Sequence, residues 1–248
     1  NGDFVEIKNG HYKLFDSDLN EIDREIQEID WEVSEAEKAG HDHFMYKEIL
    51  EQPEVIERTI SGRIETTSEE IPIKLDEASK YEKIWIVACG TAYHAGLFGK
   101  DLFEKVLGVP VSVELASEFR YREPIVGKND LGIVISQSGE TMDTIAATEL
   151  LKENGAHVLA LVNVVGSSLA RMADSIFYLH VGPEIGVAST KAYLGMLVGQ
   201  LLLAKHWDSA NKLDVSFDEI AELPKLIEQT MACEKQIKDI SEKIYKKN

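Results

Sequence analysis

The chain has 248 residues, of which 44% are hydrophobic, so it is long and apolar enough for one large domain with additional segments. Its formal net charge of −18 argues against nucleic acid or an anionic membrane as a partner, because both are polyanions. The two cysteines, Cys89 and Cys233, form no disulfide framework, and the sequence contains neither a membrane-spanning apolar run nor a signal peptide, so we expect a cytoplasmic location.

Residues 1–34 differ from the rest of the chain. Two short runs of alternating apolar and polar residues flank Asn9-Gly10, which is the strongest short signal for a β-hairpin. An isolated hairpin is marginal in water, so we expect this one to pack on a sheet that lies outside the chain. An acidic segment containing Trp31 follows. We interpret residues 1–34 as the end of one domain, and because the chain opens with Asn1 rather than Met we expect it to be part of a longer protein.

Residues 35–75 predict a helical linker. Apolar residues from Met45 onward have the spacing of amphipathic helices, which are interrupted near Pro53. His41 and His43 are two residues apart, a spacing that could serve a metal on a strand. No further ligand types complete a set, so we interpret both as linker histidines and expect no metal.

The main domain, residues 76–214, alternates short apolar runs with helical patterns. We predict five buried strands, at residues 84–90, 110–115, 131–135, 157–162 and 175–180. This alternation predicts an α/β fold with a five-stranded parallel sheet between two layers of helices, in the flavodoxin-like order 2-1-3-4-5. Residues 215–248 predict a charged, amphipathic pair of helices around Pro224.

The segment Ser-Gln-Ser-Gly-Glu-Thr at residues 136–141 is the strongest candidate for a binding site. It lies between a strand and a helix, where backbone N–H groups lack partners and the helix dipole favours an anion. An ordinary capped turn is the commoner explanation of any single turn of this kind, and the negative net charge also weighs against an anionic ligand. The density of hydroxyl and amide groups favours a phosphate site, because N–H groups act at contact distance whereas distant charges are screened.

The predicted strand order places a second turn beside the first. In this order the first and third strands are neighbours, and ligands bind beyond the carboxyl ends of the strands at that point. The turn Cys-Gly-Thr-Ala at residues 89–92 should therefore meet the turn at residues 136–141. Gly90 does not belong to a G-x-G-x-x-G motif and no P-loop is present, so a dinucleotide is a weak alternative.

Six motifs carry a resemblance to a known family. They are CGTAY at residues 89–93, SEFRY at 117–121, SQSGET at 136–141, GSSL at 166–169, EIGVASTK at 184–191 and, in the linker, HFMYKEILEQP at 43–53. In this order they resemble the first sugar isomerase (SIS) domain of glutamine–fructose-6-phosphate aminotransferases and the linker before it. The hairpin is similar to the end of the glutaminase domain in the same family.

The resemblance implies a reaction and a set of site residues. The family transfers ammonia from glutamine to fructose 6-phosphate in amino sugar synthesis, giving glucosamine 6-phosphate and glutamate, and it needs no cofactor. By position, the phosphate loop is matched by Ser136, Gln137, Ser138 and Thr141, a further sugar-phosphate contact by Thr91, and the sugar lining by Val187 and Ser189. Ala92 departs from the serine that some members have. The nucleophilic cysteine and the second repeat, with its lysine, glutamate and histidine, are missing, so the chain should bind a hexose 6-phosphate without turning it over.

Individual side chains near this site have simpler interpretations. Glu140 and Glu184 are the nearest carboxylates by sequence, and Glu140 in a first helical turn is explained by the dipole alone. Lys191 also falls in a first turn, where the dipole disfavours it, so it requires either a carboxylate or the ligand as a partner. Cys89 is expected to be a buried small apolar residue, and His94 to satisfy local hydrogen bonds.

Two further expectations concern partners and an alternative function. The alternative is a stand-alone phosphosugar-sensing module without catalysis. Two features disfavour it: the hairpin has nothing to pack on, and the last helix carries apolar residues that nothing is expected to cover. The helices near residues 94–107 and 188–205 carry more apolar residues than one sheet face needs, which predicts a homodimer. The remaining expected partner is the rest of the same polypeptide.

Overall fold

The computed structural model describes residues 3–24, 37–65 and 68–245, and the chain divides into two compact units, Asn1–Asp30 and Trp31–Asn248. The first unit is an antiparallel sheet in the order β1-β2-β3, made of β1 (Phe4–Lys8), β2 (His11–Phe15) and β3 (Glu21–Ile22). Asn9 and Gly10 join the first two strands with φ values of 51° and 78°, the left-handed conformation that an Asn-Gly hairpin turn requires. The predicted hairpin is confirmed, and β3 is an additional strand. Trp31 lies outside the described residues.

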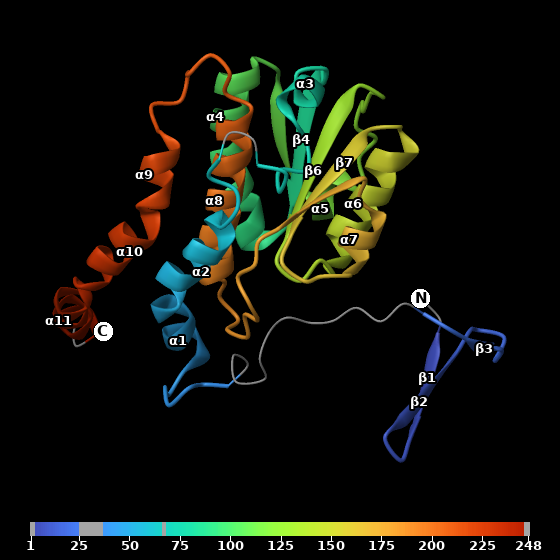
Figure 1. The fold of residues 1–248 in the computed structure, drawn as a ribbon, viewed down its shortest axis with the longest axis horizontal. Helices are drawn as coiled ribbons and strands as arrows, with labels where there is room; N and C mark the ends of the chain where they lie inside the picture. Colours follow the sequence, from blue (N-terminus) through green and yellow to red (C-terminus); the bar gives the residue numbers. More distant parts are fainter. Residues whose placement is uncertain (1–2, 25–36, 66–67, 246–248) are drawn as a thin grey trace. The chain divides into compact units, whose positions relative to one another are not determined.

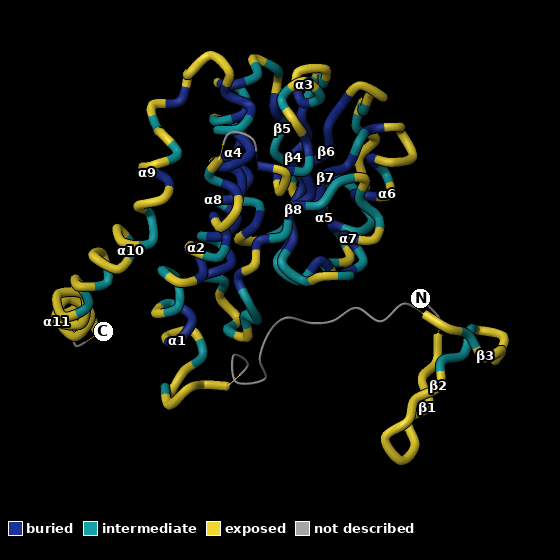
Figure 2. Tube along the Cα trace, in the orientation of Figure 1, coloured by how far each residue is buried: buried dark blue, intermediate teal, exposed yellow. Residues whose placement is uncertain are grey.

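The strands of the first unit bury little of their apolar surface. Ile7 is 77% exposed, and Phe4, Val5 and Tyr12 are also exposed (Figure 2). A two- or three-stranded sheet with no cover on its apolar side chains has little stability of its own. These side chains therefore remain available to a further surface.

The linker forms helices, as predicted. Helix α1 (Phe44–Leu50) is followed by α2 (Gln52–Ile60), and the break falls at Glu51, just before Pro53 in the first turn of α2. Val55 and Ile56 are buried because α2 packs against the main domain (Figure 1). The linker is therefore a packed part of the larger unit, and a short helix, α3 (Leu75–Ala78), follows it.

The main domain contains the predicted parallel sheet. Its strands are β4 (Lys83–Ala88), β5 (Val111–Leu115), β6 (Asp130–Ser136), β7 (His157–Val162) and β8 (Ser175–Tyr178). Their order, β5-β4-β6-β7-β8, is the expected 2-1-3-4-5, and every neighbouring pair is parallel. The helices that cover it are α4 (Gly90–Leu107), α5 (Ala116–Phe119), α6 (Met142–Glu153), α7 (Ser168–Met172) and α8 (Lys191–His206).

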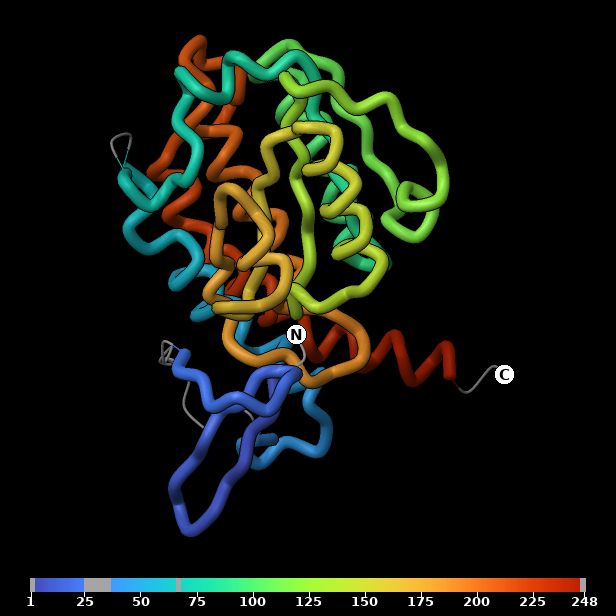
Figure 3. The backbone as a smooth tube through the Cα atoms, turned by 90° about the vertical axis from the view of Figure 1, so that its right-hand side faces the viewer, coloured from blue at the N-terminus to red at the C-terminus, as the bar shows by residue number. Residues whose placement is uncertain are grey.

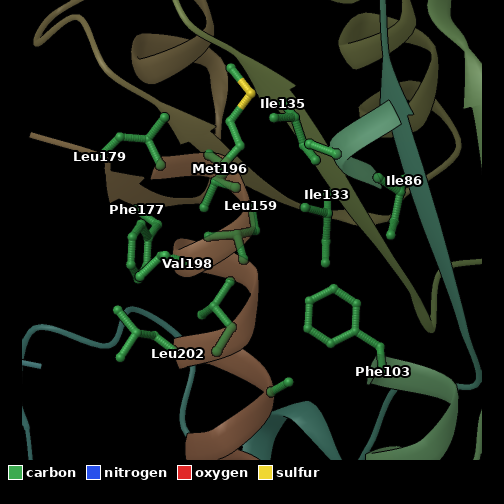
Figure 4. Close-up of a cluster of buried hydrophobic side chains, with 14 of the residues drawn as sticks. Ile86, Phe103, Ile133, Ile135, Leu159, Phe177, Leu179, Met196, Val198 and Leu202 are labelled. Carbon is green, nitrogen blue, oxygen red and sulfur yellow. The ribbon is translucent and has the colours of Figure 1, made fainter. Parts of the chain in front are cut away.

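Alternate strand residues build two apolar layers, one on each face of the sheet. On one face Ile86, Ile133 and Leu159 pack with side chains from α4 and α8 (Figure 4). On the other face Val87 and Val134 join a second buried cluster with residues of α5, α6 and α7. Figure 1 shows the same three layers, with α2, α4 and α8 on one side of the sheet and α5, α6 and α7 on the other. A strand buried on both faces is apolar at successive positions, which explains the continuous apolar runs in the sequence.

Helix α8 is apolar around most of its circumference because it is enclosed within this unit. It packs against the sheet, against α4 and, on another side, against α2. The excess of apolar residues near 188–205 is thus covered by the linker, which was not foreseen, and it gives no support to a dimer surface. On α4, Leu97 and Phe98 remain substantially exposed.

The C-terminal segment forms three helices rather than the predicted pair. They are α9 (Phe217–Ala221), α10 (Leu223–Met231) and α11 (Glu234–Tyr245). Ser216 and Glu219 form a capping box that starts α9, and Pro224 lies in the first turn of α10. Ile237 and Ile240 of α11 are exposed, and α11 points away from the sheet (Figure 3). Within the described part of the chain, no helix combines the length and the apolar character that crossing a membrane requires.

Candidate functional site

The two polar turns lie together at the carboxyl edge of the sheet. Because β4 and β6 are hydrogen-bonded neighbours, the turns that follow them leave the sheet side by side. Both turns line one pocket of about 230 Å³. Its lining residues are Cys89, Thr91, Ala92, Ile135, Ser136, Gln137, Ser138, Thr141, Val187, Ser189 and Met196. The structure therefore brings together all seven residues that the sequence analysis proposed as binding residues.

The turn after β6 is held in shape by its own side chains. The backbone N–H of Gly139 donates to Ser136 Oγ at 3.0 Å, and Ser136 Oγ lies 3.2 Å from Thr141 Oγ1. The N–H of Glu140 donates to Ser138 Oγ at 3.2 Å. Gly139 has φ 66°, and a Cβ at this position would lie 2.5 Å from Ser167 Cβ. Glycine is required here both for the left-handed backbone and for the close approach of Ser167.

Two helix N-termini face the pocket. Helix α4 begins at Gly90 and α6 begins at Met142, in each case directly beside residues that line the pocket. The first N–H groups of a helix have no acceptor within it, and neither N-cap residue, Cys89 or Thr141, supplies one from its side chain. The lining contains no Lys or Arg. The arrangement can hold an anion through backbone N–H groups, hydroxyls and helix dipoles.

A third segment, residues 183–190, closes one side of the pocket. It contributes the fully exposed side chain of Val187 and the side chain of Ser189. Ser189 Oγ is buried, yet it has no hydrogen-bond partner among the described residues. An unsatisfied buried hydroxyl costs free energy, so a ligand with a hydroxyl or another polar group would find a ready partner here.

Carboxylates from two parts of the chain hold this third segment. Glu184 accepts hydrogen bonds from the N–H groups of Thr190 and Ala192 and so serves the N-terminus of α8. Glu48 of α1, which is 2% exposed, accepts from the N–H of Ile185 at 2.6 Å and from that of Gly186. Glu48 could not be identified from the sequence, because nothing local distinguishes it from the other glutamates of the linker.

Lys191 has a carboxylate as its partner. Its Nζ lies 2.7 Å from Glu51 Oε2, and Lys47 Nζ lies 3.1 Å from the other oxygen of Glu51. Although burial raises the pKa of Glu51, the hydrogen bonds from Lys191 and Lys47 outweigh it and hold this pKa below its ordinary value. Of the two partners left open for Lys191, carboxylate or ligand, the structure selects the carboxylate, and Lys191 is absent from the pocket lining.

Three other expectations need correction. Glu140 precedes α6 rather than lying in its first turn, and its carboxylate accepts from the N–H of Ser168 at 2.7 Å, at the start of α7. The hydrogen bonds from Ser168 lower the pKa of Glu140. Cys89 is half-buried and lines the pocket instead of belonging wholly to the core. His94 is exposed and lies edge-on to the ring of Tyr93.

The domain that carries this pocket matches a known family. The family model described as SIS domain matches residues 78–205, which is more than half of the chain. The chain belongs to the SIS domain family. The five-stranded parallel sheet with helices on both faces agrees with this assignment.

Similar proteins narrow the relationship. The chain is 46% identical over 255 residues to the glutamine–fructose-6-phosphate aminotransferase [isomerizing] of Clostridium tetani, covering 99% of this chain and 42% of that protein. It is 44% identical over 257 residues to the enzyme of the same name from Clostridium acetobutylicum, covering 98% of this chain and 42% of that protein. The chain therefore spans less than half of the length of these relatives.

A solved structure shows the same fold. The C-terminal domain of glucosamine-fructose-6-phosphate aminotransferase from Francisella tularensis aligns with a TM-score of 0.69 and 36% sequence identity. The alignment covers 83% of this chain and 61% of that chain. Most of this chain is thus similar in fold to the C-terminal domain of an aminotransferase.

Proposed function

We propose that the pocket binds a hexose 6-phosphate, and that the chain is the first isomerase-half domain of a glutamine–fructose-6-phosphate aminotransferase. The single observation that carries the proposal is the convergence of Thr91, Ser136, Ser138 and Ser189 on one pocket between two helix N-termini. The names of the similar aminotransferases contain fructose 6-phosphate, and glucosamine 6-phosphate is the product that the family resemblance implies.

Within this pocket we assign the two ends of the ligand to different segments. Ser136, Gln137, Ser138 and Thr141 would bind the phosphate with the N–H groups at the start of α6, and Thr91 would add a contact from the neighbouring turn. Val187 and Ser189 would face the sugar, which has the hydroxyls that Ser189 Oγ needs. A phosphate dianion can be held without a cationic side chain when several N–H groups point at it.

The chain on its own is proposed to bind sugar phosphate without converting it. Glutamine hydrolysis and the isomerisation chemistry would reside in other parts of a longer polypeptide, which would work in the cytoplasm as a homodimer and need no cofactor. The exposed apolar residues of the N-terminal sheet, such as Ile7, offer a surface on which the rest of a glutaminase domain could pack. Leu97 and Phe98 on α4 remain candidates for a contact between subunits.

Calorimetry tests the proposal. Fructose 6-phosphate and glucosamine 6-phosphate should each bind the chain at least tenfold more tightly than inorganic phosphate, because the sugar adds contacts with the third segment. Equal affinity for all three ligands would remove the sugar from the proposal and leave only an anion site. A matched titration of Thr141→Val should weaken all three ligands together, since all share the phosphate.

A further inference from the structure

The segment that would face the sugar is held to the linker by a set of charged side chains, of which Lys47, Glu48 and Lys191 are buried. The carboxylate of Glu48 in α1 accepts hydrogen bonds from the N–H groups of Ile185 and Gly186, directly before Val187. Glu51, between α1 and α2, forms an ion pair with Lys191, which directly follows the segment. The segment is therefore held at both of its ends by residues that lie about 140 positions earlier in the chain.

The fit between linker and segment is close. A Cβ on Gly186 would lie 2.5 Å from Glu48 Oε2 and 3.5 Å from the Cα of Met45. Lys191 and Lys47 are 1% and 6% exposed, so their charges are largely withdrawn from water, and the side chain of Glu51 between them is 24% exposed. A charge removed from water costs free energy unless an opposite charge pairs with it, so the position of each of these side chains constrains the positions of the others.

The other side of the pocket has no such dependence. The turn at residues 136–141 is braced by its own side chains and by N–H donors of residues 163–169. Among the described residues no hydrogen bond or ion pair joins it to the linker. Loosening the linker contact should therefore change the side that faces the sugar and leave the anion-binding side intact. Val187 and Ser189 would then sample positions in which they no longer meet the ligand.

Given the proposed function, we infer that Glu48 and Glu51 are positioning residues for sugar recognition. They touch no ligand themselves; they hold residues 184–191 so that Val187 and Ser189 line the sugar end of the pocket. The linker thus sets the preference of the pocket for a sugar phosphate over a bare phosphate. Hydrogen bonds to a charged, buried acceptor are strong enough for their loss to shift this preference by about tenfold.

The test compares two ligands on the same variants of the 248-residue chain. In Glu48→Ala, affinity for fructose 6-phosphate should fall about tenfold, while affinity for inorganic phosphate should stay within about twofold. Glu48→Gln retains an oxygen that can accept one N–H group, so it should restore most of the lost affinity. Glu54→Gln, a change to an exposed residue of α2, is the matched control and should affect neither ligand.

The outcomes separate the two ideas. If the wild-type chain prefers fructose 6-phosphate and Glu48→Ala keeps that preference, or loses both ligands equally, the positioning role is wrong while the proposed function stands. If the wild-type chain shows no preference, the proposed function fails and the positioning role fails with it. Should Glu48→Ala not fold, Glu51→Gln gives the same comparison, with an expected threefold loss for the sugar phosphate and none for phosphate.

Discussion

The pocket has two walls that are built in different ways. The turn at residues 136–141 is stabilised by hydrogen bonds among residues at most five positions apart, Ser136 with Gly139 and with Thr141. The segment at residues 183–190 is held by its own Glu184 and, in addition, by Glu48 of the linker and by the ion pair between Glu51 and the adjoining Lys191. The first wall is held by bonds within its own six residues and by N–H donors of residues 163–169 in the same domain, whereas the second also needs the linker. The side proposed to bind the anion is therefore held within the domain, while the side proposed to face the sugar depends on contacts with the linker.

The largest expected effect concerns the stability of the turn at residues 136–141. Gly139→Ala should lower the free energy of unfolding by about 3 kcal/mol, from left-handed strain of about 1 kcal/mol and overpacking against Ser167 of about 2 kcal/mol. Urea denaturation measures it. Gly108→Ala is the control, because it has φ 73° and no atom near the added Cβ, so only the strain should appear. Adding Ser167→Gly to Gly139→Ala should recover most of the overpacking, and no recovery would count against the clash.

The stability of the domain should depend on the ion pair between Lys191 and Glu51, beside the segment at residues 183–190. Lys191→Met should lower the free energy of unfolding by about 2 kcal/mol, less than for a fully buried pair, because Glu51 is 24% exposed and Lys47 still faces it. Lys225→Met removes an exposed pair with Glu222 and should change stability little. Denaturation curves of both variants, measured together, make the comparison. A loss below about 1 kcal/mol for Lys191→Met would mean that the pair contributes little to holding this wall.

A smaller effect concerns the affinity of the turn at residues 136–141 for inorganic phosphate. Ser136→Ala removes the acceptor for the N–H of Gly139 and a hydroxyl of the pocket, so inorganic phosphate should bind about tenfold more weakly. Calorimetry with phosphate gives the value, and the exposed hydroxyl of Ser209 provides a control through Ser209→Ala. Unchanged phosphate binding in Ser136→Ala would place the anion elsewhere.

The smallest effect concerns the pH dependence of the contact between the linker and α8. His206 lies 2.7 Å from the carbonyl oxygen of Arg63, and burial lowers the pKa of His206 below its ordinary value. The unfolded chain therefore takes up the proton first, so the contribution of His206 is present above pH 6.5 and is lost as pH falls below it. Thermal unfolding at pH 5.5 and 7.5 should show a larger loss of stability on acidification for the wild type than for His206→Gln. Equal losses would contradict this sign.

Much of the fold and the meeting of the two polar turns could be predicted from the sequence pattern, whereas Val187 and Ser189 were expected only from the family resemblance. The alternation of apolar runs with helical patterns indicated the parallel sheet, and the neighbouring first and third strands brought Thr91 and Ser136 to one edge. The third helix of the C-terminal segment was missed because nothing at Cys233 resembles a strong helix stop. The cover of α8 by α2 was missed because an apolar helix surface does not reveal which element will bury it.

The sequence by itself determined the local features of this protein: the Asn-Gly turn, the buried strands and the hydroxyl-rich turn at residues 136–141. These follow from backbone conformations and from periods of apolar residues that a few neighbouring positions encode. Only the tertiary structure decided that Glu48 and Glu51 would hold residues 184–191 and that Lys191 would face a carboxylate. Such pairings depend on which charges lose their water together when distant segments pack, and that is a property of the folded arrangement.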